Sequence, residues 1–151
     1  MNERHAIPNA LLLGEVCALL ADGRKVKLRA KGGSMRPFIR GDEDILVLGP
    51  PTQLRRGDVV LARRGTDEYV LHRIVRMTAG CIVLAGDANL YQREECRPED
   101  ICGKAETLVR NGRQYRLTSP SARLCACLWY SLLPFRRLGW KVRSMIANRK
   151  Q

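Results

Sequence analysis

Histidine is the scarcest of the chemically active residues in this chain of 151 residues, which has only His5 and His72. The six cysteines contain no Cys-x-x-Cys pair, and the two histidines are far apart. Zinc sites are built from clusters of these two residue types at short spacings. The pattern therefore argues against a metal site, and we expect no metal or other cofactor.

Long apolar runs are also lacking. No stretch reaches the roughly 18 apolar residues that a membrane-spanning helix needs, and Gly14 and Glu15 interrupt the most apolar part of the N-terminal segment. This segment lacks the charged start and the continuous apolar core of a secretory signal peptide. The chain is too large and too apolar to need a disulfide scaffold, so we expect free thiols and a protein kept in the reducing cytoplasm.

Acidic residues are absent from residues 107–151, which carry ten lysines and arginines. The whole chain has 27 basic and 15 acidic residues and a formal charge of +12, so ten of the twelve excess charges lie in this last part. A chain of this length can bury one full core. The sequence therefore predicts one nearly charge-balanced domain, residues 1–118, and a basic tail, residues 119–151.

Seven short β-prone runs follow one short helical pattern. Leu13, Val16, Cys17 and Leu20 have helical spacing and predict an amphipathic helix over about residues 9–21. The β-prone runs are bounded by Gly, Pro and Asp, and they cover residues 26–30, 44–48, 58–62, 69–75, 81–85, 101–109 and 113–117. No helix-length segments separate these runs, which indicates a compact, mainly β domain with mostly antiparallel strands.

The basic tail alternates apolar and aromatic residues with cations. Pro134 and Gly139 should break or kink any helix here, which predicts two short amphipathic helices. Seven cations in residues 123–150 suit a segment that lies on an anionic membrane surface, with Trp129 and Trp140 at the level of the lipid headgroups. The alternative is a helical tail that packs on the β domain and leaves its basic face in water.

Four boxes rich in glycine and aspartate hold the candidate chemistry. They are Gly32-Gly-Ser-Met-Arg-Pro-Phe-Ile-Arg-Gly-Asp42, Arg56-Gly-Asp-Val-Val60, Val70-Leu-His-Arg-Ile-Val75 and Leu84-Ala-Gly-Asp-Ala-Asn89. Ser34 follows two glycines and precedes Pro37, a combination that can present a hydroxyl group at a strand edge. A serine needs a base to take its proton, and His72 is the histidine that a strand would hold in place.

Both candidate residues also have a purely structural alternative. Gly32-Gly33-Ser34 alone is compatible with an ordinary turn. Strand alternation puts His72 on the same face as Val70 and Ile74, where a histidine can belong to the core. The aspartates that follow glycine in the boxes can be turn residues. The functional interpretation is favoured by the resemblance described next, because independent turns have no reason to reproduce the four boxes of one superfamily in order.

Taken in order, the four boxes resemble the signal peptidase and LexA-like serine peptidase superfamily (S24/S26 type). The box around His72 is most similar to that of the histidine-type signal peptidases. The resemblance covers about residues 26–110 and implies a β-rich peptidase fold, with Ser34 as the nucleophile and His72 as the general base. The third member of a triad stays open between Asp87, which matches its box, and Glu94, which follows at a longer spacing.

The function that the resemblance implies is a serine endopeptidase of the signal-peptidase type, which cleaves leader or signal peptides through a Ser-His dyad or triad. Gly32 offers no hydroxyl group two residues before Ser34, so backbone amides, starting with that of Ser34, have to form the oxyanion hole. The alternative is a catalytically inactive peptidase-like module that binds peptides or a membrane.

The expected partners follow from the same features. The resemblance implies a peptide or protein leader as the substrate, with small side chains near the cut. Only 33 residues precede Ser34 and they offer one helix, which is too short for the DNA-reading domain of LexA-like regulators, so we expect no DNA binding. The tail, residues 123–150, adds an anionic membrane surface as a hypothetical partner, with the protein at the inner face of the cytoplasmic membrane.

Overall fold

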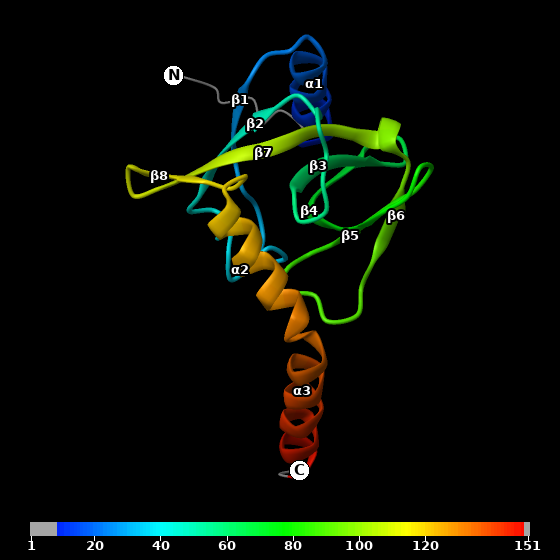
Figure 1. The fold of residues 1–151 in the computed structure, drawn as a ribbon, viewed down its shortest axis with the longest axis vertical. Coiled ribbons are helices and arrows are strands. Elements are labelled where there is room, and N and C mark those ends of the chain that lie inside the picture. Colours follow the sequence, from blue (N-terminus) through cyan, green and yellow to red (C-terminus); the bar gives the residue numbers. More distant parts are fainter. Residues whose placement is uncertain (1–8, 150–151) are drawn as a thin grey trace, which may run out of the picture.

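A computed structural model describes residues 9–149 of the chain. Within these residues the chain forms one eight-stranded sheet, with one α-helix before it and two after it (Figure 1). The strands are β1 (Val26–Arg29), β2 (Ile45–Gly49), β3 (Val59–Arg64), β4 (Glu68–Met77), β5 (Ile82–Ala85), β6 (Glu94–Cys96), β7 (Ile101–Arg110) and β8 (Arg113–Arg116). The helices are α1 (Asn9–Ala21), the short 3-10 helix η1 (Pro98–Asp100), α2 (Pro120–Ser131) and α3 (Leu133–Asn148).

Every strand pairing in the sheet is antiparallel. The strand order is β1-β2-β7-β3-β4-β5-β6, with β8 paired to β7. Leu61 on β3 belongs to the larger core, which α1 completes with Leu20, whereas the adjacent Val60 belongs to a smaller core that includes Ile74. The expectation of a mainly antiparallel β domain after a short helix is confirmed.

Strand β6 is the one strand that the sequence pattern does not predict. Its three residues, Glu94-Glu95-Cys96, are too few and too polar to give a β-prone run. They pair with β5, where Leu84 lies opposite Glu94. The unpredicted strand therefore carries one of the two acids proposed as the third member of a triad.

The basic tail folds as two helices that meet at Leu132. Ser119 caps the start of α2 by accepting a hydrogen bond from the amide of Ala122 at 3.2 Å. Pro134 lies in the first turn of α3, where proline is tolerated because the first amides of a helix have no intrahelical acceptor. Gly139 lies inside α3, so the prediction that it breaks the helix is wrong. Helix α3 extends away from the sheet (Figure 1).

None of the helices within residues 9–149 combines the length and the apolar character that a membrane crossing requires. All six cysteines are free thiols. His5 lies outside the described residues.

Candidate active site

Ser34 lies in the loop that joins β1 to β2. The amide of Asp42 donates a hydrogen bond to the carbonyl of Ala30 at 2.7 Å, which ties the two ends of this loop together. Gly41 passes so close to Gly32 that a Cβ atom at Gly41 would overlap the Gly32 carbonyl group. Only glycine permits this approach, and the result is a compact loop in which the Ser34 side chain is half-buried.

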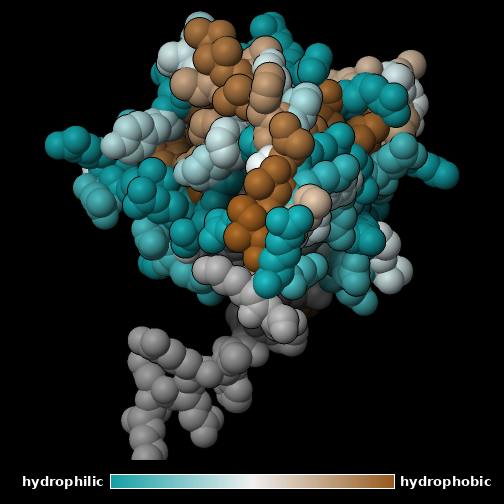
Figure 2. Space-filling model, turned by 90° about the horizontal axis from the view of Figure 1, so that it is seen from below, coloured by the Kyte–Doolittle hydropathy of each residue, from teal (hydrophilic) through white to brown (hydrophobic). Residues whose placement is uncertain are grey.

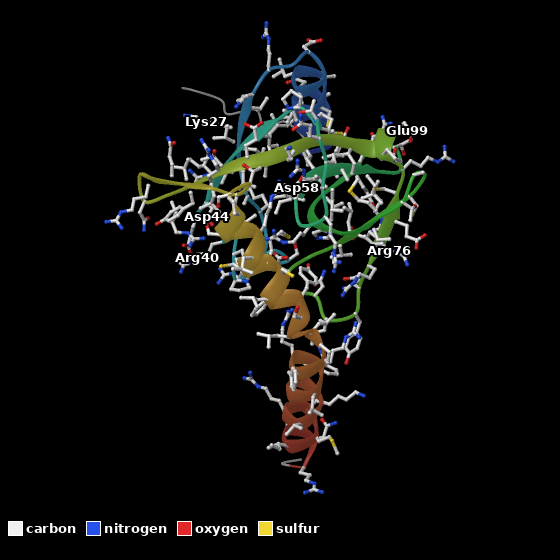
Figure 3. All side chains as sticks on the ribbon, viewed as in Figure 1. Lys27, Arg40, Asp44, Asp58, Arg76 and Glu99 are labelled. Atoms are coloured by element: carbon white, nitrogen blue, oxygen red, sulfur yellow. The ribbon has the colours of Figure 1, made fainter. Side chains whose placement is uncertain are left out.

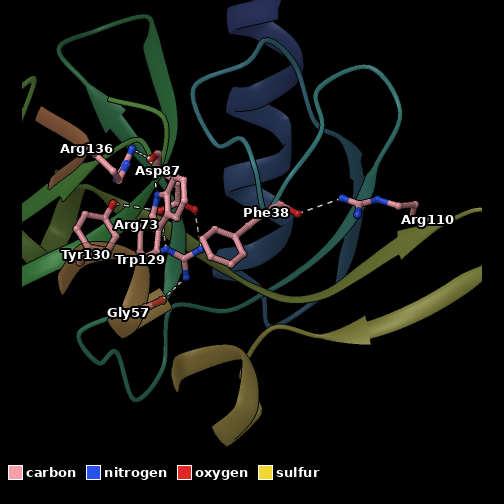
Figure 4. Close-up of polar contacts among 8 residues, drawn as sticks. All are labelled: Phe38, Gly57, Arg73, Asp87, Arg110, Trp129, Tyr130 and Arg136. Atoms are coloured by element: carbon pink, nitrogen blue, oxygen red, sulfur yellow. Dashed lines mark hydrogen bonds and ion pairs between the residues drawn. The ribbon is translucent and has the colours of Figure 1, made fainter. Parts of the chain in front are cut away.

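A buried ion pair anchors the far end of this loop. The Asp44 carboxylate accepts hydrogen bonds from Arg110 Nε at 2.7 Å and Nη2 at 2.6 Å, and from the amide of Arg40 at 2.7 Å. Burial alone would raise the pKa of Asp44, but these hydrogen bonds and the nearby positive charges outweigh it and lower the pKa. Arg110 also donates to the carbonyl of Phe38 at 3.0 Å (Figure 4). Strand β7 therefore holds the loop that carries Ser34.

His72 on β4 brings a hydroxyl group and a carboxylate together. Its Nε2 atom lies 3.3 Å from Ser34 Oγ, and its Nδ1 atom lies 2.8 Å from Glu94 Oε2. An ionised carboxylate only accepts hydrogen bonds, so Nδ1 has to carry the proton in this arrangement. The lone pair of Nε2 then faces the serine hydroxyl group. This is the tautomer of histidine that can accept the proton of that hydroxyl group.

The register of three strands explains why Glu94 reaches His72. Leu84 on β5 lies directly opposite Ile74 on β4 and directly opposite Glu94 on β6. Cross-strand partners point to the same face of a sheet, as do residues two apart on one strand. Since His72 is two residues from Ile74, its side chain shares a face with that of Glu94. Arg64 Nη1 lies 3.5 Å from the second carboxylate oxygen of Glu94 and helps to orient it.

Asp87 does not reach His72, contrary to the expectation from its box. Arg73 is next to His72 on β4 and therefore points to the opposite face. Its cross-strand partner is Ala85, and Asp87 follows Ala85 by two residues. The buried Asp87 carboxylate accepts hydrogen bonds from Arg73 Nε at 2.8 Å and Nη2 at 2.7 Å. The acid next to the imidazole is thus corrected from Asp87 to Glu94, the alternative left open by the sequence.

Asp87 instead joins the C-terminal helices to the sheet. Its Oδ1 atom accepts a hydrogen bond from the Tyr130 hydroxyl group at 3.1 Å, and its carbonyl accepts from Trp129 Nε1 and Arg136 Nη2, each at 2.8 Å (Figure 4). Burial, followed by the negative charge of Asp87, raises the pKa of Tyr130. Trp129 also packs edge-on against Phe38, with ring centroids 5.9 Å apart. Trp129 therefore packs on the β domain.

A second buried acid attaches the start of α2. Asp58 directly precedes β3 and is buried, and Figure 3 shows it within the domain, near α2. One of its carboxylate oxygens is 3.2 Å from Arg123 Nη2, and the other accepts a hydrogen bond from the amide of Arg55 at 2.8 Å. Helix α2 is thus a packed part of the domain.

The loop that carries Asp87 also contacts the backbone of Ser34. The amide of Ala88 donates a hydrogen bond to the Ser34 carbonyl at 2.9 Å. A Cβ atom at Gly86 would lie 2.6 Å from that same carbonyl oxygen, which is closer than non-bonded atoms pack. The Gly86-Asp87 box therefore fixes the position of the serine loop, whereas His72 and Glu94 form the polar chain behind its hydroxyl group.

A cleft of about 190 Å³ opens beside Ser34 and His72. Its lining is mixed, with polar residues such as Lys31 and His72 beside the apolar side chains of Ala30, Met35, Ile39, Val70 and Leu71. A larger cleft of about 540 Å³ shares Ala30, Tyr69 and Leu71 with it and continues along β1 and α1. Strand β1 is at one edge of the sheet. An edge strand beside an apolar cleft is a common binding surface for an extended peptide.

An antiparallel β domain in which a loop serine, a strand histidine and a carboxylate lie in line has the architecture of a serine peptidase. The sequence agrees with this class, since residues 6–106 match the Peptidase S24-like family. This match covers more than half of the chain, so the chain belongs to that family, within the LexA and signal peptidase superfamily. A search of curated protein sequences finds no match to the chain.

Proposed function

We propose that the protein is a serine endopeptidase in which Ser34 is the nucleophile, His72 the general base and Glu94 the acid that orients the imidazole. The observation that carries the proposal is the continuous chain of side-chain contacts. Ser34 Oγ lies 3.3 Å from His72 Nε2, and His72 Nδ1 lies 2.8 Å from Glu94 Oε2. If Ser34, His72 and Glu94 were only turn or core residues, their side chains would have no reason to line up as hydroxyl group, imidazole and carboxylate.

In the proposed reaction, Ser34 Oγ attacks the scissile carbonyl carbon while its proton passes to His72 Nε2. The imidazolium is stabilised by Glu94 and returns the proton to the leaving amine, which gives an acyl-enzyme. Water then attacks the ester with His72 again as the base, which breaks the bond to Ser34 Oγ, releases the acyl part as a carboxylic acid and returns the proton to the serine. The Ser34 amide is proposed as an oxyanion-hole donor, because no backbone carbonyl among residues 9–149 accepts a hydrogen bond from it.

The proposed substrate is the leader or signal part of a peptide or protein, bound as an extended strand. Support comes from the position of the catalytic cleft next to the edge strand β1 and from the larger apolar cleft that continues from it along β1 and α1. Small side chains next to the cut are expected from the resemblance to the histidine-type signal peptidases. We propose the cytoplasm as the compartment, in keeping with six free thiols.

The competing proposal, an inactive peptidase-like module that binds peptides, depends on the lack of an acid at the expected position of the triad. Glu94 supplies a carboxylate at 2.8 Å from His72 Nδ1, so we prefer the enzyme. The two proposals differ in one outcome, which is whether peptide bonds are cut.

The test is cleavage of a proteome-derived peptide library, with new termini identified by mass spectrometry. We expect the wild-type chain to cut at a consistent set of sites, and Ser34→Ala and His72→Gln each to reduce cleavage by at least about 10⁴-fold. Both variants should unfold at the wild-type temperature, which separates lost chemistry from lost structure. Cleavage retained by Ser34→Ala would refute the proposed nucleophile.

A further inference from the structure

Exposed apolar side chains form a continuous line along α2 and α3. They are 49% to 70% exposed and recur every three or four positions, at Leu124, Leu128, Leu132, Phe135, Leu138, Val142, Met145 and Ile146. This spacing places them on one helical face, which we call the apolar stripe. Helical hydrogen bonds continue through the junction, from the amide of Leu132 to the carbonyl of Leu128 and from the amide of Arg136 to the carbonyl of Leu132. The stripe therefore runs on from one helix into the next.

The opposite face of α3 is attached to the domain at its near end. Arg137 Nε donates a hydrogen bond to the carbonyl of Leu90 at 2.9 Å, and Trp140 packs edge-on against Tyr91 with ring centroids 6.2 Å apart. These contacts fix the rotation of α3 about its own axis. The apolar stripe consequently faces away from the domain, and no other part of residues 9–149 covers it.

Positive charge borders the stripe. Within α3 and the residue after it the charged side chains are all cations, namely Arg136, Arg137, Lys141, Arg143 and Arg149. Lys141 and Arg143 flank Val142 in the sequence, so they project to either side of the stripe, and both are exposed. Figure 2 looks at the molecule from the α3 end and shows a band of hydrophobic residues bordered by hydrophilic ones.

We propose that the apolar stripe and its flanking cations bind the surface of an anionic lipid bilayer. The helix would lie in the membrane plane, with apolar side chains at the boundary between headgroups and acyl chains and with Lys141 and Arg143 reaching the phosphates. A helix of 16 residues is about 24 Å long, which suits a position along the surface. A second copy of the chain fits this face less well. Pairing the two stripes would bring the cations of both α3 helices together, with no acidic residue on α3 to offset their repulsion.

This proposal goes beyond the peptidase function and does not depend on it. It assigns binding to α3, whereas every residue of the proposed chemistry lies in the β domain. Ser34→Ala protein can therefore be used throughout the test, so a failure of membrane binding and a failure of catalysis are seen separately.

The test measures co-flotation of the full chain with vesicles of 30% phosphatidylglycerol in phosphatidylcholine and with vesicles of phosphatidylcholine alone. We expect binding to the anionic vesicles that exceeds binding to the neutral ones by more than about tenfold and that weakens with added salt. Phe135→Gln combined with Val142→Gln should reduce anionic binding by more than about tenfold. Lys141→Gln combined with Arg143→Gln should reduce it by about fivefold for each charge removed.

Matched controls change the same chemistry elsewhere on the surface. Leu11→Gln combined with Tyr115→Gln removes two exposed apolar side chains, and Arg76→Gln combined with Arg113→Gln removes two exposed charges. Neither control should change binding by more than about twofold, on the grounds that both lie outside the proposed bilayer-binding face.

Three outcomes contradict the proposal. One is equal binding to anionic and neutral vesicles, and another is a loss in the controls as large as in the α3 variants. The third is a dimer in solution that Phe135→Gln with Val142→Gln dissociates, because the stripe would then belong to an interface between copies of the chain.

Discussion

Two adjacent residues of β4, His72 and Arg73, each have an acidic partner, and the two pairs differ in almost everything else. His72 meets Glu94 next to the cleft that contains Ser34. Arg73 meets Asp87 on the opposite face, where both carboxylate oxygens are engaged and the acid is fully buried. One pair is placed to hold a proton-accepting imidazole, and the other to hold the C-terminal helices.

The alternation of side chains along β4 decides which of the two acids can contact His72. A shift of one residue along β4 moves a side chain to the other face of the sheet. Asp87, two residues beyond Ala85, thus lies on the face of Arg73, and Glu94 on β6 lies on the face of His72. The two acids should therefore respond to substitution in opposite ways, one in activity and the other in stability.

The largest effect is expected from Glu94→Gln, which preserves the shape of the side chain but removes its charge. The imidazolium formed during the reaction loses its counter-charge, so we expect kcat/KM to fall by about 10³- to 10⁴-fold. The free energy of unfolding should change by less than about 1 kcal/mol, since Glu94 is partly exposed and Gln can still accept a hydrogen bond. Steady-state cleavage of a library-derived peptide and urea unfolding give the two values. Unchanged kcat/KM would remove Glu94 from the proposed triad.

Asp87→Asn should show the reverse pattern. It leaves the buried guanidinium of Arg73 without a counter-charge, which costs about 3 to 5 kcal/mol of the free energy of unfolding. At a temperature where the variant stays folded, kcat/KM should fall by less than about tenfold, as expected of a residue outside the reacting chain of atoms.

Asp42→Asn is the matched control for Asp87→Asn. Asp42 pairs with Lys31 at 3.3 Å, but the two side chains are 69% and 70% exposed, so the change in stability should be below about 1 kcal/mol. If urea unfolding gives equal losses for the two variants, the structural role assigned to the buried pair is wrong.

The smallest effect is expected in how the free energy of unfolding depends on pH through Asp44, whose pKa is lowered in the folded protein. A group with a lower pKa when folded stabilises the protein fully above its unfolded pKa of about 3.9, and this contribution is lost as the pH falls through the folded value. Lowering the pH below about 4 should therefore reduce the free energy of unfolding of the wild type more steeply than that of Asp44→Asn. Urea unfolding at each pH measures the two values. Identical slopes for the two proteins would contradict the role of the Asp44–Arg110 ion pair.

Much of the fold can be predicted from the sequence because it depends on local pattern. Apolar runs bounded by glycine and aspartate identify seven strands, and helical spacing identifies α1. Strand β6 cannot be predicted this way, because Glu94-Glu95-Cys96 has no apolar run and is held only by pairing with β5. The prediction that Gly139 breaks the helix fails for a different reason, because one glycine lowers helix stability without ending the helix.

The candidate site could be predicted in part. Ser34 and His72 follow from the order of the boxes, and the structure brings their side chains within hydrogen-bond reach. The choice between Asp87 and Glu94 depends on strand register, which pairs Arg73 with Ala85 and places Leu84 opposite both Ile74 and Glu94, and the sequence does not reveal this register. The packing of Trp129 against Phe38 depends on where α2 lies, and an amphipathic pattern alone does not specify that.

The most direct test of the central claim is the Nδ1 proton of His72, observed by NMR in the His5→Gln background, where His72 is the only histidine. We predict a downfield Nδ1–H resonance, with Nε2 unprotonated, in the parent protein and in Asp87→Asn. This resonance should be lost or move markedly upfield in Glu94→Gln, because a neutral amide replaces the charged carboxylate and accepts a weaker hydrogen bond. A resonance that survives Glu94→Gln but disappears in Asp87→Asn would contradict the assignment of Glu94 as the partner of His72.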